Sequence, residues 1–273
     1  MSGSNQQGTA LITGASSGIG ATYADRLARR GYDLILVARN ETRLSQLADR
    51  LRDETGVRVE IIGADLTHRR DLDNVERRLR NDEQISLLVN NAGAAVPSSF
   101  VGADVERLDN LIQLNIVAVM RLASAVLPGF VARQRGTLIN LGSVTALLPE
   151  QFGGVYSGTK AFVLNLTQAL QTEVGGQGIR VQAVLPGATA TEIWERSGIG
   201  LDYLPPEVIM SVDDMVDAAL AGLDQGEVIT LPSLPDPQLW DGFVEARFAL
   251  SPYLSLNTPA LRYGVGETTN ANS

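Results

Sequence analysis

Short apolar runs alternate with longer amphipathic runs along most of this chain, and this alternation constrains the fold more than any other feature. Six apolar runs, rich in valine, isoleucine and leucine, have the length of buried strands, at residues 9–13, 33–39, 57–66, 85–93, 136–144 and 179–187. Strands that alternate with helices form a parallel sheet that is covered by helices on both faces. The sequence therefore predicts a doubly wound α/β fold with three layers, α/β/α.

The chain has 273 residues, enough for one large α/β domain with a proper core. We expect this single domain to span residues 9–263, between polar, disordered ends at residues 1–8 and 264–273. Residues 232–263 are punctuated by proline and moderately apolar. We interpret them as a C-terminal extension of the domain that packs on the pocket mouth or on a neighbouring subunit.

The composition excludes several classes of function. The net charge of −9 disfavours nucleic acid and anionic membrane surfaces as partners. The absence of cysteine excludes thiol nucleophiles and cysteine-ligated zinc, and the single histidine, His68, lies in a polar segment typical of a solvated helix start. We expect no metal site. The N-terminus lacks the apolar core of a signal peptide, and we expect no run to span a membrane, so a cytoplasmic location is predicted.

A glycine-rich turn, TGASSGIG, follows the first predicted strand and opens an amphipathic helix that ends near Gly31. Strand, glycine turn and helix in this order are what a dinucleotide-binding loop requires. Gly14 permits a tight turn, Gly18 and Gly20 permit close approach of backbone and helix, and the helix N-terminus offers free N–H groups to a pyrophosphate. Glycines also mark ordinary turns, but these flanks favour the dinucleotide site of a Rossmann fold.

The end of the second predicted strand indicates which dinucleotide binds. An acidic residue there holds the ribose 2′-hydroxyl of NAD, whereas an arginine accommodates the 2′-phosphate of NADP. Here the strand ends in Ala38 and Arg39, and Glu41 falls in the next helix. The alternative is that Arg39 is an ordinary surface arginine. We predict that the cofactor is NADP(H) in preference to NAD(H).

Polar and small residues end the third and fourth predicted strands. Asp65 can accept a hydrogen bond from the adenine amino group while Leu66 packs on the ring. In the motif NNAG, Asn91 can bond strand-end backbone groups, and the small residues Ala92 and Gly93 let a cofactor lie against the backbone. Because ligands of open α/β sheets bind at the carboxyl ends of the strands, we expect these residues to border one crevice.

A long helical segment is predicted over residues 104–133, with Pro128 and Gly129 expected to bend or divide it. Asn115 lies in this segment between Leu114 and Ile116. From the residues alone, a catalytic role for Asn115 and a polar side chain satisfied within the helix are about equally supported.

The stretch SVTALLPEQFGGVYSGTK carries the groups that we interpret as catalytic. Tyr156 and Lys160 are four residues apart, about one helical turn, so they share a helix face. A lysine near a phenol favours the phenolate, and a tuned phenol exchanges a proton with an alcohol or carbonyl oxygen. Ser143, at the end of the fifth strand, can hydrogen-bond the same oxygen. The stretch predicts carbonyl/alcohol chemistry, for which the glycine turn would bind the hydride carrier.

Together these motifs resemble the short-chain dehydrogenase/reductase family, in its single-domain branch. The resemblance spans about residues 9–231 and rests on TGASSGIG, Asp65, NNAG, Asn115, Ser143, YSGTK and Pro186–Gly187, all in the family's order and spacing. It implies that Tyr156 is the general acid/base and that Lys160 lowers the tyrosine pKa and holds the nicotinamide ribose. It also implies that Ser143 polarises the substrate oxygen and that Asn115 anchors a water in a proton relay toward Lys160.

The resemblance assigns a larger set of residues to the cofactor: Gly14, Ser16, Ser17, Gly18, Ile19, Gly20, Arg39, Asp65, Leu66, Asn91, Ala92, Gly93, Tyr156 and Lys160. Four more residues are implied near the nicotinamide, namely Pro186, Gly187, Thr189 and Thr191. The chain departs from the family in one place, because NADP-preferring members often carry a basic residue where Ser17 stands here. Arg39 must then carry most of the preference for the 2′-phosphate.

In this family the segment after the sixth strand, here residues 188–212, forms a lid over the substrate, although it can also be an ordinary surface connection. We expect Trp194 to contact substrate together with Ser143 and Tyr156. The apolar and aromatic residues of the lid, with Trp240, favour an apolar or aromatic ketone or aldehyde. The family also implies a homodimer or homotetramer.

The resulting prediction is an NADP(H)-dependent oxidoreductase that reversibly transfers hydride between the nicotinamide and a carbonyl or secondary alcohol. One alternative is an NADP-dependent epimerase or dehydratase on the same fold, which only the C-terminal extension supports. Another is a non-catalytic dinucleotide-binding protein, which degraded catalytic positions would indicate. None of the predicted catalytic positions is degraded.

Overall fold

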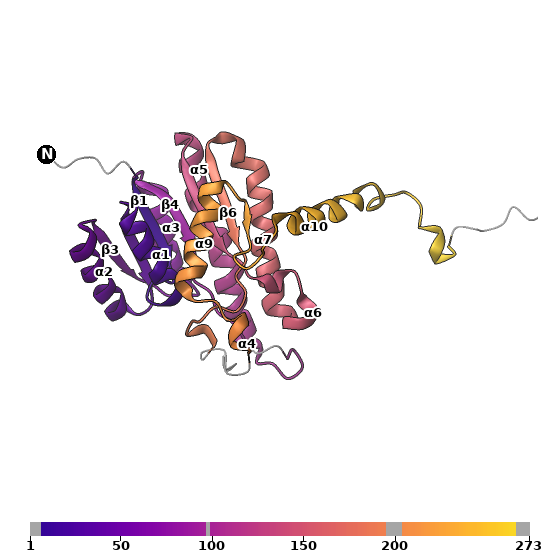
Figure 1. Cartoon of the computed structure of the whole chain (residues 1–273), viewed down its shortest axis with the longest axis horizontal. Helices are drawn as coiled ribbons and strands as arrows, with labels where there is room; N and C mark the ends of the chain where they lie inside the picture. The colour runs from indigo at the N-terminus through magenta and orange to yellow at the C-terminus, as the bar shows by residue number, and fades with distance from the viewer. Residues whose placement is uncertain (1–6, 97–98, 195–203, 266–273) are drawn as a thin grey trace, which may run out of the picture. The chain divides into compact units, whose positions relative to one another are not determined.

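The computed structural model describes residues 7–96, 99–194 and 204–265. It contains a seven-stranded parallel sheet with the strand order β3-β2-β1-β4-β5-β6-β7 (Figure 1). The six predicted strands are all present, and a short seventh strand follows them. Their bounds are β1 Thr9–Thr13, β2 Asp33–Ala38, β3 Val59–Gly63, β4 Ile85–Asn90, β5 Gly136–Leu141, β6 Ile179–Val184 and β7 Ile229–Thr230.

Helices cover both faces of the sheet, and successive strand residues point into two separate cores. In β1, Ala10 and Ile12 pack in a core with α1, α2 and α9, whereas Leu11 packs in the opposite core with α3 and α5. These helices are α1 Gly18–Arg29, α2 Glu41–Thr55, α3 Arg69–Asn81, α5 Val119–Arg133 and α9 Val212–Gln225. The predicted three-layer α/β/α architecture, that of a Rossmann fold, is confirmed.

The remaining helices of this part of the chain lie between β4 and β6 or are short turns near the site. They are α4 Val105–Ile112, the π-helix η1 Gln113–Ala118, η2 Val144–Ala146, α6 Pro149–Phe152, α7 Gly154–Val174, η3 Gly175–Gln177 and η5 Pro206–Val208. The predicted long helix that carries Tyr156 and Lys160 is α7.

The strand order reverses at β1. From β1 the chain moves outward to β2 and β3, and it then returns to place β4 on the other side of β1. In open α/β sheets, such a reversal leaves a crevice at the carboxyl ends of the two central strands. The glycine turn after β1 and the NNAG motif at the end of β4 therefore meet at this crevice.

The helical run formed by α4, η1 and α5 changes geometry at η1, and α5 continues through Pro128, so the expected division at Pro128 was wrong, while a bend there stays a prediction. Pro128 lies inside α5, and it is exposed. Ser124, whose carbonyl loses its helical partner at this proline, is also exposed, so water can satisfy that carbonyl. The helix continues because the missing bond faces solvent.

The same run also corrects the expectation that no apolar run is long enough to span a membrane. Over residues 105–133 it is long enough to cross a membrane, and its mean hydropathy of 1.8 is high enough. Half of its most apolar window is buried inside the protein, where Leu122 and Phe130 of α5 belong to the core under the sheet. Its apolar character is therefore explained by packing against β4, β5 and α3.

The chain divides into two compact units, and the second begins at Ser233. The second unit contains α10 (Pro237–Ala249) and the turns η6 (Ser251–Tyr253) and η7 (Leu261–Tyr263). The Asp236 side chain caps α10 by accepting a hydrogen bond from the Gln238 N–H at 2.9 Å. Among its described residues this unit buries none. The domain limits predicted from the sequence stay a prediction.

Candidate active site

Ser143 and Tyr156 come together where the chain leaves β5 and enters α7. Ser143 is buried two residues after the last residue of β5, and Tyr156 lies in the first turn of α7. A hydrogen bond joins their side chains. The Ser143 Oγ also accepts a hydrogen bond from the Thr145 N–H at 3.2 Å. The hydrogen bond between Ser143 and the phenol acts to lower the pKa of Tyr156.

Lys160 lies one turn after Tyr156 and is buried. Its Nζ donates to the Leu141 carbonyl at 2.9 Å and lies 5.8 Å from the centre of the Tyr156 ring. Burial lowers the pKa of Lys160 to about 8. Burial also raises the pKa of Tyr156 to about 12, against the opposing effect of the Ser143 hydrogen bond. Lowering of the tyrosine pKa by Lys160 stays a prediction.

Asn115 is buried in η1, and its side chain is hydrogen-bonded on both sides. Its Oδ1 accepts from the Ala94 N–H at 3.0 Å, and its Nδ2 donates to the Ala94 carbonyl at 3.0 Å and to Thr159 Oγ1 at 3.1 Å. Thr159 Oγ1 in turn donates to the Tyr156 carbonyl at 2.7 Å. Asn115 thus ties η1 to the loop after β4 and to the turn of α7 that carries the tyrosine.

Gly93 keeps a small space open between Asn115 and Lys160. A Cβ atom at Gly93 would lie 3.3 Å from Asn115 Oδ1 and 3.6 Å from Lys160 Nζ. Water can bridge polar groups across a space of this kind. The space supports the predicted relay between Asn115 and Lys160, which stays a prediction.

The glycine turn after β1 has the geometry of a phosphate cradle. Gly14 and Gly18 have positive φ values of 67° and 53°, and a Cβ at Gly20 would collide with the Gly14 carbonyl. Among the described residues, the Ser17 side chain makes no capping hydrogen bond to α1, and the first turn of α1 holds no acid. Its N–H groups are therefore available to an anion, so these residues fit a dinucleotide pyrophosphate. Half-buried around the cradle are Ser16, Ser17 and Ile19.

Asn91 and Ala92 hold the glycine turn in place. The Asn91 Nδ2 donates to the Thr13 carbonyl at 2.8 Å and to the Gly14 carbonyl at 3.2 Å. The N–H groups of Asn91 and Ala92 both donate to Thr13 Oγ1 at 3.0 Å. The NNAG motif therefore fixes the two sides of the crevice relative to each other, and its predicted contact with the cofactor stays a prediction.

Arg39 and Asp65 face each other beyond the ends of β2 and β3. Arg39 Nη1 lies 3.7 Å from Asp65 Oδ2, and the arginine side chain is 71% exposed. Burial acts to raise the pKa of Asp65, but hydrogen bonds from Thr67 and the charge of Arg39 outweigh it and lower that pKa. Leu66 is buried beside this pair. An exposed and loosely paired guanidinium at this place fits a 2′-phosphate.

The segment after β6 is fastened at its base. The Val144 N–H donates to the Pro186 carbonyl at 3.0 Å, so the residue after Ser143 is joined to the end of β6. Thr189 and Met210 form a parallel bridge that closes the base of the predicted lid, and Thr189 Oγ1 donates to the Gly187 carbonyl at 3.3 Å. These contacts place the residues predicted near the nicotinamide next to the Ser143 segment.

Two further predicted residues lie on this lid base. The Trp194 Nε1 donates to the Thr189 carbonyl at 2.8 Å, which ties the indole to the lid base. The methyl group of Thr191 would lie 3.2 Å from a Cβ at Gly18, so this threonine packs against the glycine turn. Contact of Trp194 with substrate stays a prediction, and residues 195–203 of the lid fall outside the described residues.

A shallow hollow lies beside Tyr156. The side chains around it are mostly apolar, as in most small-molecule sites, and come from the loop after β4, from α4 and from the start of α7. They are Val96, Ser99, Phe100, Leu108, Gly153, Val155 and Tyr156. The sequence analysis identified only the tyrosine, because the other residues belong to no motif.

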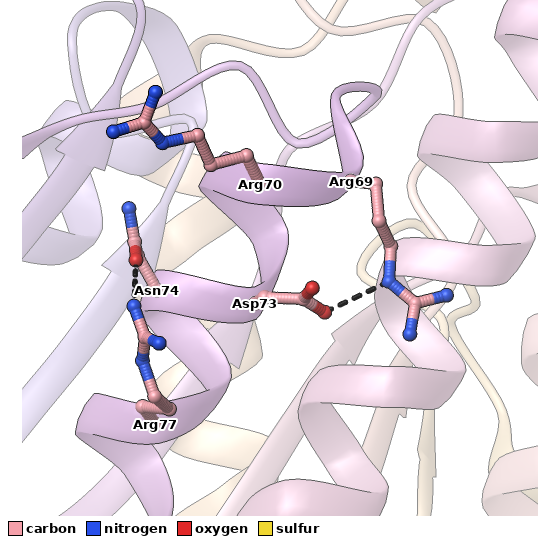
Figure 2. Close-up of a pocket in the computed structure, with 5 residues that line it drawn as sticks. All are labelled: Arg69, Arg70, Asp73, Asn74 and Arg77. Atoms are coloured by element: carbon pink, nitrogen blue, oxygen red, sulfur yellow. Dashed lines mark hydrogen bonds and ion pairs between the residues drawn. The ribbon is translucent and has the colours of Figure 1, made fainter.

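A second hollow lies on α3 and is lined by side chains of that helix alone (Figure 2). Two of its arginines already have partners: Arg69 donates to Asp73 at 2.9 Å, and Arg77 donates to Asn74. The structure describes all five lining residues, and among them only Arg70 has no side-chain partner. An open surface with one unpaired cation is a weaker candidate site than the apolar hollow at Tyr156.

The structure also brings together two residues that the sequence analysis did not consider. Arg43 Nη1, on the first turn of α2, lies 2.9 Å from both carboxylate oxygens of Glu192 on the predicted lid. Among the described residues there is no group of three or more acidic or histidine side chains that could hold a metal ion.

Comparisons with known proteins agree with this geometry. The family model described as short chain dehydrogenase matches residues 8–200. An uncharacterised oxidoreductase of Staphylococcus saprophyticus is 35% identical over 222 residues, which cover 81% of this chain and 92% of the relative. A very-long-chain 3-oxoacyl-CoA reductase of Anas platyrhynchos is 34% identical over 202 residues, which cover 72% of this chain and 65% of the relative. The chain thus spans just under two thirds of the length of that second relative.

Two solved structures are similar over nearly the whole chain. A short-chain dehydrogenase from Sphingobium yanoikuyae in complex with NADPH is 52% identical, with a TM-score of 0.90 over 93% of this chain and 98% of that one. A bulky-bulky ketone specific alcohol dehydrogenase from Comamonas testosteroni is 45% identical, with a TM-score of 0.87. The similarity covers 95% of this chain and 99% of that one. By its sequence and its fold, the chain belongs to the short-chain dehydrogenase family of oxidoreductases.

Proposed function

We propose that this protein is an NADP(H)-dependent carbonyl reductase that acts on apolar or aromatic ketones and aldehydes. The observation that carries the proposal is the hydrogen-bonded arrangement of Ser143 and Tyr156, with Lys160 one turn away, beside an apolar hollow at the sheet crevice. Similarity to an NADPH complex and to a ketone-specific alcohol dehydrogenase supports both parts of the proposal.

In the reductive direction, bound NADPH supplies a hydride to the carbonyl carbon. Tyr156 donates its phenolic proton to the carbonyl oxygen, because a neutral phenol is the form that burial favours. Ser143 donates a hydrogen bond to the same oxygen, where negative charge develops. The charge of Lys160 then stabilises the phenolate that remains. Reprotonation of Tyr156 proceeds through Lys160 and a relay that includes Asn115.

The residues at the crevice support the choice of cofactor. The uncapped N-terminus of α1 and the glycine turn fit a pyrophosphate, and exposed Arg39 at the end of β2 fits a 2′-phosphate. Similar solved structures in complex with NADPH support the binding of NADP(H). The preference for NADP(H) over NAD(H) is part of the proposal.

The lining of the hollow supports the choice of substrate. Valine, leucine and phenylalanine side chains predominate there, so an apolar group on the carbonyl carbon gains free energy by burial. A nucleotide sugar would need polar partners for its hydroxyl groups and charges for its phosphates. The hollow therefore favours a ketone over the substrates of the epimerase alternative.

Two measurements test this function. We expect the wild-type protein to oxidise NADPH in the presence of aromatic ketones, and Tyr156→Phe to lower kcat by roughly a hundredfold or more because the proton donor is removed. The Kd for NADPH should stay unchanged in this variant, as measured by fluorescence titration. Retained turnover in Tyr156→Phe would refute the proton-donor role, and absence of turnover with every carbonyl would refute the reductase itself.

We further propose that the protein works in the cytoplasm as a homodimer or homotetramer on small-molecule substrates. The family and the net charge of −9 support this setting. Light scattering of the purified protein measures the oligomeric state.

A further inference from the structure

We propose that Arg43 is a second specificity-determining residue for the 2′-phosphate of NADP(H), in addition to Arg39. This inference rests on the proposed function and extends it. Position 17, where many NADP-preferring relatives carry a basic side chain, is a serine in this chain. The structure binds another guanidinium, from α2, to Glu192, and the neighbouring residue Thr191 packs on the glycine turn.

A continuous path of contacts links Arg43 to the phosphate cradle. The Arg43 guanidinium is bound to the Glu192 carboxylate, across 149 residues of sequence. The neighbouring residue of Glu192, Thr191, packs against Gly18. The arginine is therefore joined, through Glu192, to the segment whose Thr191 packs on the glycine turn.

The backbone of Arg43 is fixed at the end of the groove nearest the ribose. Its N–H donates to the side chain of Asn40, the N-cap of α2, at 3.0 Å. Arg39 directly precedes that N-cap, so the two arginines flank the junction between β2 and α2. This junction is where a Rossmann fold holds the substituent on the 2′ position.

The Arg43 guanidinium still has donors to offer. Glu192 occupies only Nη1, and neither Nε nor Nη2 has a partner among the described residues. Arg30 differs, because Asp224 occupies both of its Nη atoms at 3.0 and 2.9 Å. Arg43 can thus remain paired with Glu192 while its other nitrogens bind a phosphate, as a planar fork of donors allows.

The local charges favour an additional anion. Arg43 lies in the first turn of α2, where the helix dipole is unfavourable for a cation. Glu192 offsets this only in part, because both side chains of the pair are more than a third exposed, at 44% and 39%. A 2′-phosphate between Arg39 and Arg43 would compensate both guanidinium groups.

Binding of 2′,5′-ADP and 5′-AMP tests the inference, because the two ligands differ only in the 2′-phosphate. We expect Arg43→Gln to weaken the binding of 2′,5′-ADP about tenfold, the effect of losing one charge-assisted contact, and to leave 5′-AMP unchanged. Arg30→Gln is the control, since it breaks another exposed arginine–carboxylate pair, that of Arg30 with Asp224, and it should change neither affinity. Calorimetry at fixed salt concentration measures both.

The outcomes separate this inference from the proposed function. If the wild type binds 5′-AMP as tightly as 2′,5′-ADP, the proposed NADP(H) preference fails, and the inference fails with it. If the wild type discriminates and Arg43→Gln discriminates equally well, only the inference is overturned. Equal weakening of both ligands by Arg43→Gln also overturns it, because Arg43 would then act on the adenosine site as a whole.

Discussion

Burial of the Lys160 charge lowers the stability of the fold, although the proposed reaction requires this charge. Lys160 is buried, and burial places its folded-state pKa near 8, below the value of 10.5 for a free lysine. Between these values the unfolded chain binds more protons than the folded one, so the stability of the fold rises with pH across this window. Below about pH 8 the full cost of burying the charge is present.

We therefore predict that Lys160→Met is more stable than the wild type at pH 7, while it loses activity. The gain should be on the order of 2 kcal/mol after the lost hydrogen bond to Leu141 is subtracted, and it should shrink as pH rises toward 10.5. Urea unfolding at pH 7 and pH 10 measures the two values. A variant less stable than the wild type at pH 7 would show that the charge is compensated within the fold.

Gly93 provides a second prediction at this scale. Gly93→Ala would place a Cβ 3.3 Å from Asn115 Oδ1, a contact tight enough that Asn115 must shift slightly, and it should fill the space between Asn115 and Lys160. We expect kcat to fall roughly tenfold as the proton route narrows, with little change in the melting temperature. Gly158→Ala, on the exposed face of α7, is the control and should keep full activity. An unchanged kcat in Gly93→Ala would exclude a relay through this space.

The sequence predicted the individual residues of the site unevenly. Ser143, Tyr156 and Lys160 were predictable because helical spacing and a strand end bring them together locally. The pair of Arg43 and Glu192 was not, since 149 residues separate them and neither belongs to a motif. The carbonyl that Lys160 binds was equally hidden, because backbone acceptors leave no signal in the sequence.

Among the elements, the π-helix η1 is the one that shapes the site. A π-helix has a wider turn than the α-helices on either side of it, so it changes which residues face the neighbouring elements. Here it directs Asn115 toward the loop after β4 and toward α7. Hydrophobic periodicity predicted the long helix correctly but could not reveal η1, because a single widened turn leaves the apolar pattern almost unchanged.

We predict that Asn115→Ala destabilises the protein by about 2 kcal/mol, because it removes the two hydrogen bonds that the half-buried backbone of Ala94 makes to Asn115. The kcat should fall as well. Thr159→Val removes only one of the bonds to Asn115 and should cost about 1 kcal/mol. Thermal unfolding of both variants measures the difference. Equal stability of Asn115→Ala and the wild type would show that the loop after β4 is held by other contacts.

At the scale of the whole molecule, both cores lie within the first unit. All their buried residues precede Pro232, and so do all the residues predicted to bind the cofactor. We predict that a chain ending at Pro232 folds and binds NADPH with an unchanged Kd. Circular dichroism and fluorescence titration measure this, and an insoluble or unfolded product would show that the second unit is needed for the fold.

The architecture was predictable from the sequence because strand runs, helix runs and turn motifs agreed with one another. The sequence indicated a C-terminal extension at residues 232–263, but not that it forms a separate unit whose helix α10 has apolar residues and buries none of them within its own unit. Residues 1–232 are 85% of the chain (232 of 273), so the solved structures that cover 93% and 95% include part of this unit.

The sheet ends on β7, a strand of only two residues, Ile229 and Thr230. Exposed strand edges are where protein molecules add to one another as aggregates, and long, flat edges do so most readily. A two-residue edge offers a second molecule very few backbone groups to pair with. At high protein concentration β7 itself should therefore add little to aggregation, and substitutions that protect against it are better placed on other strands.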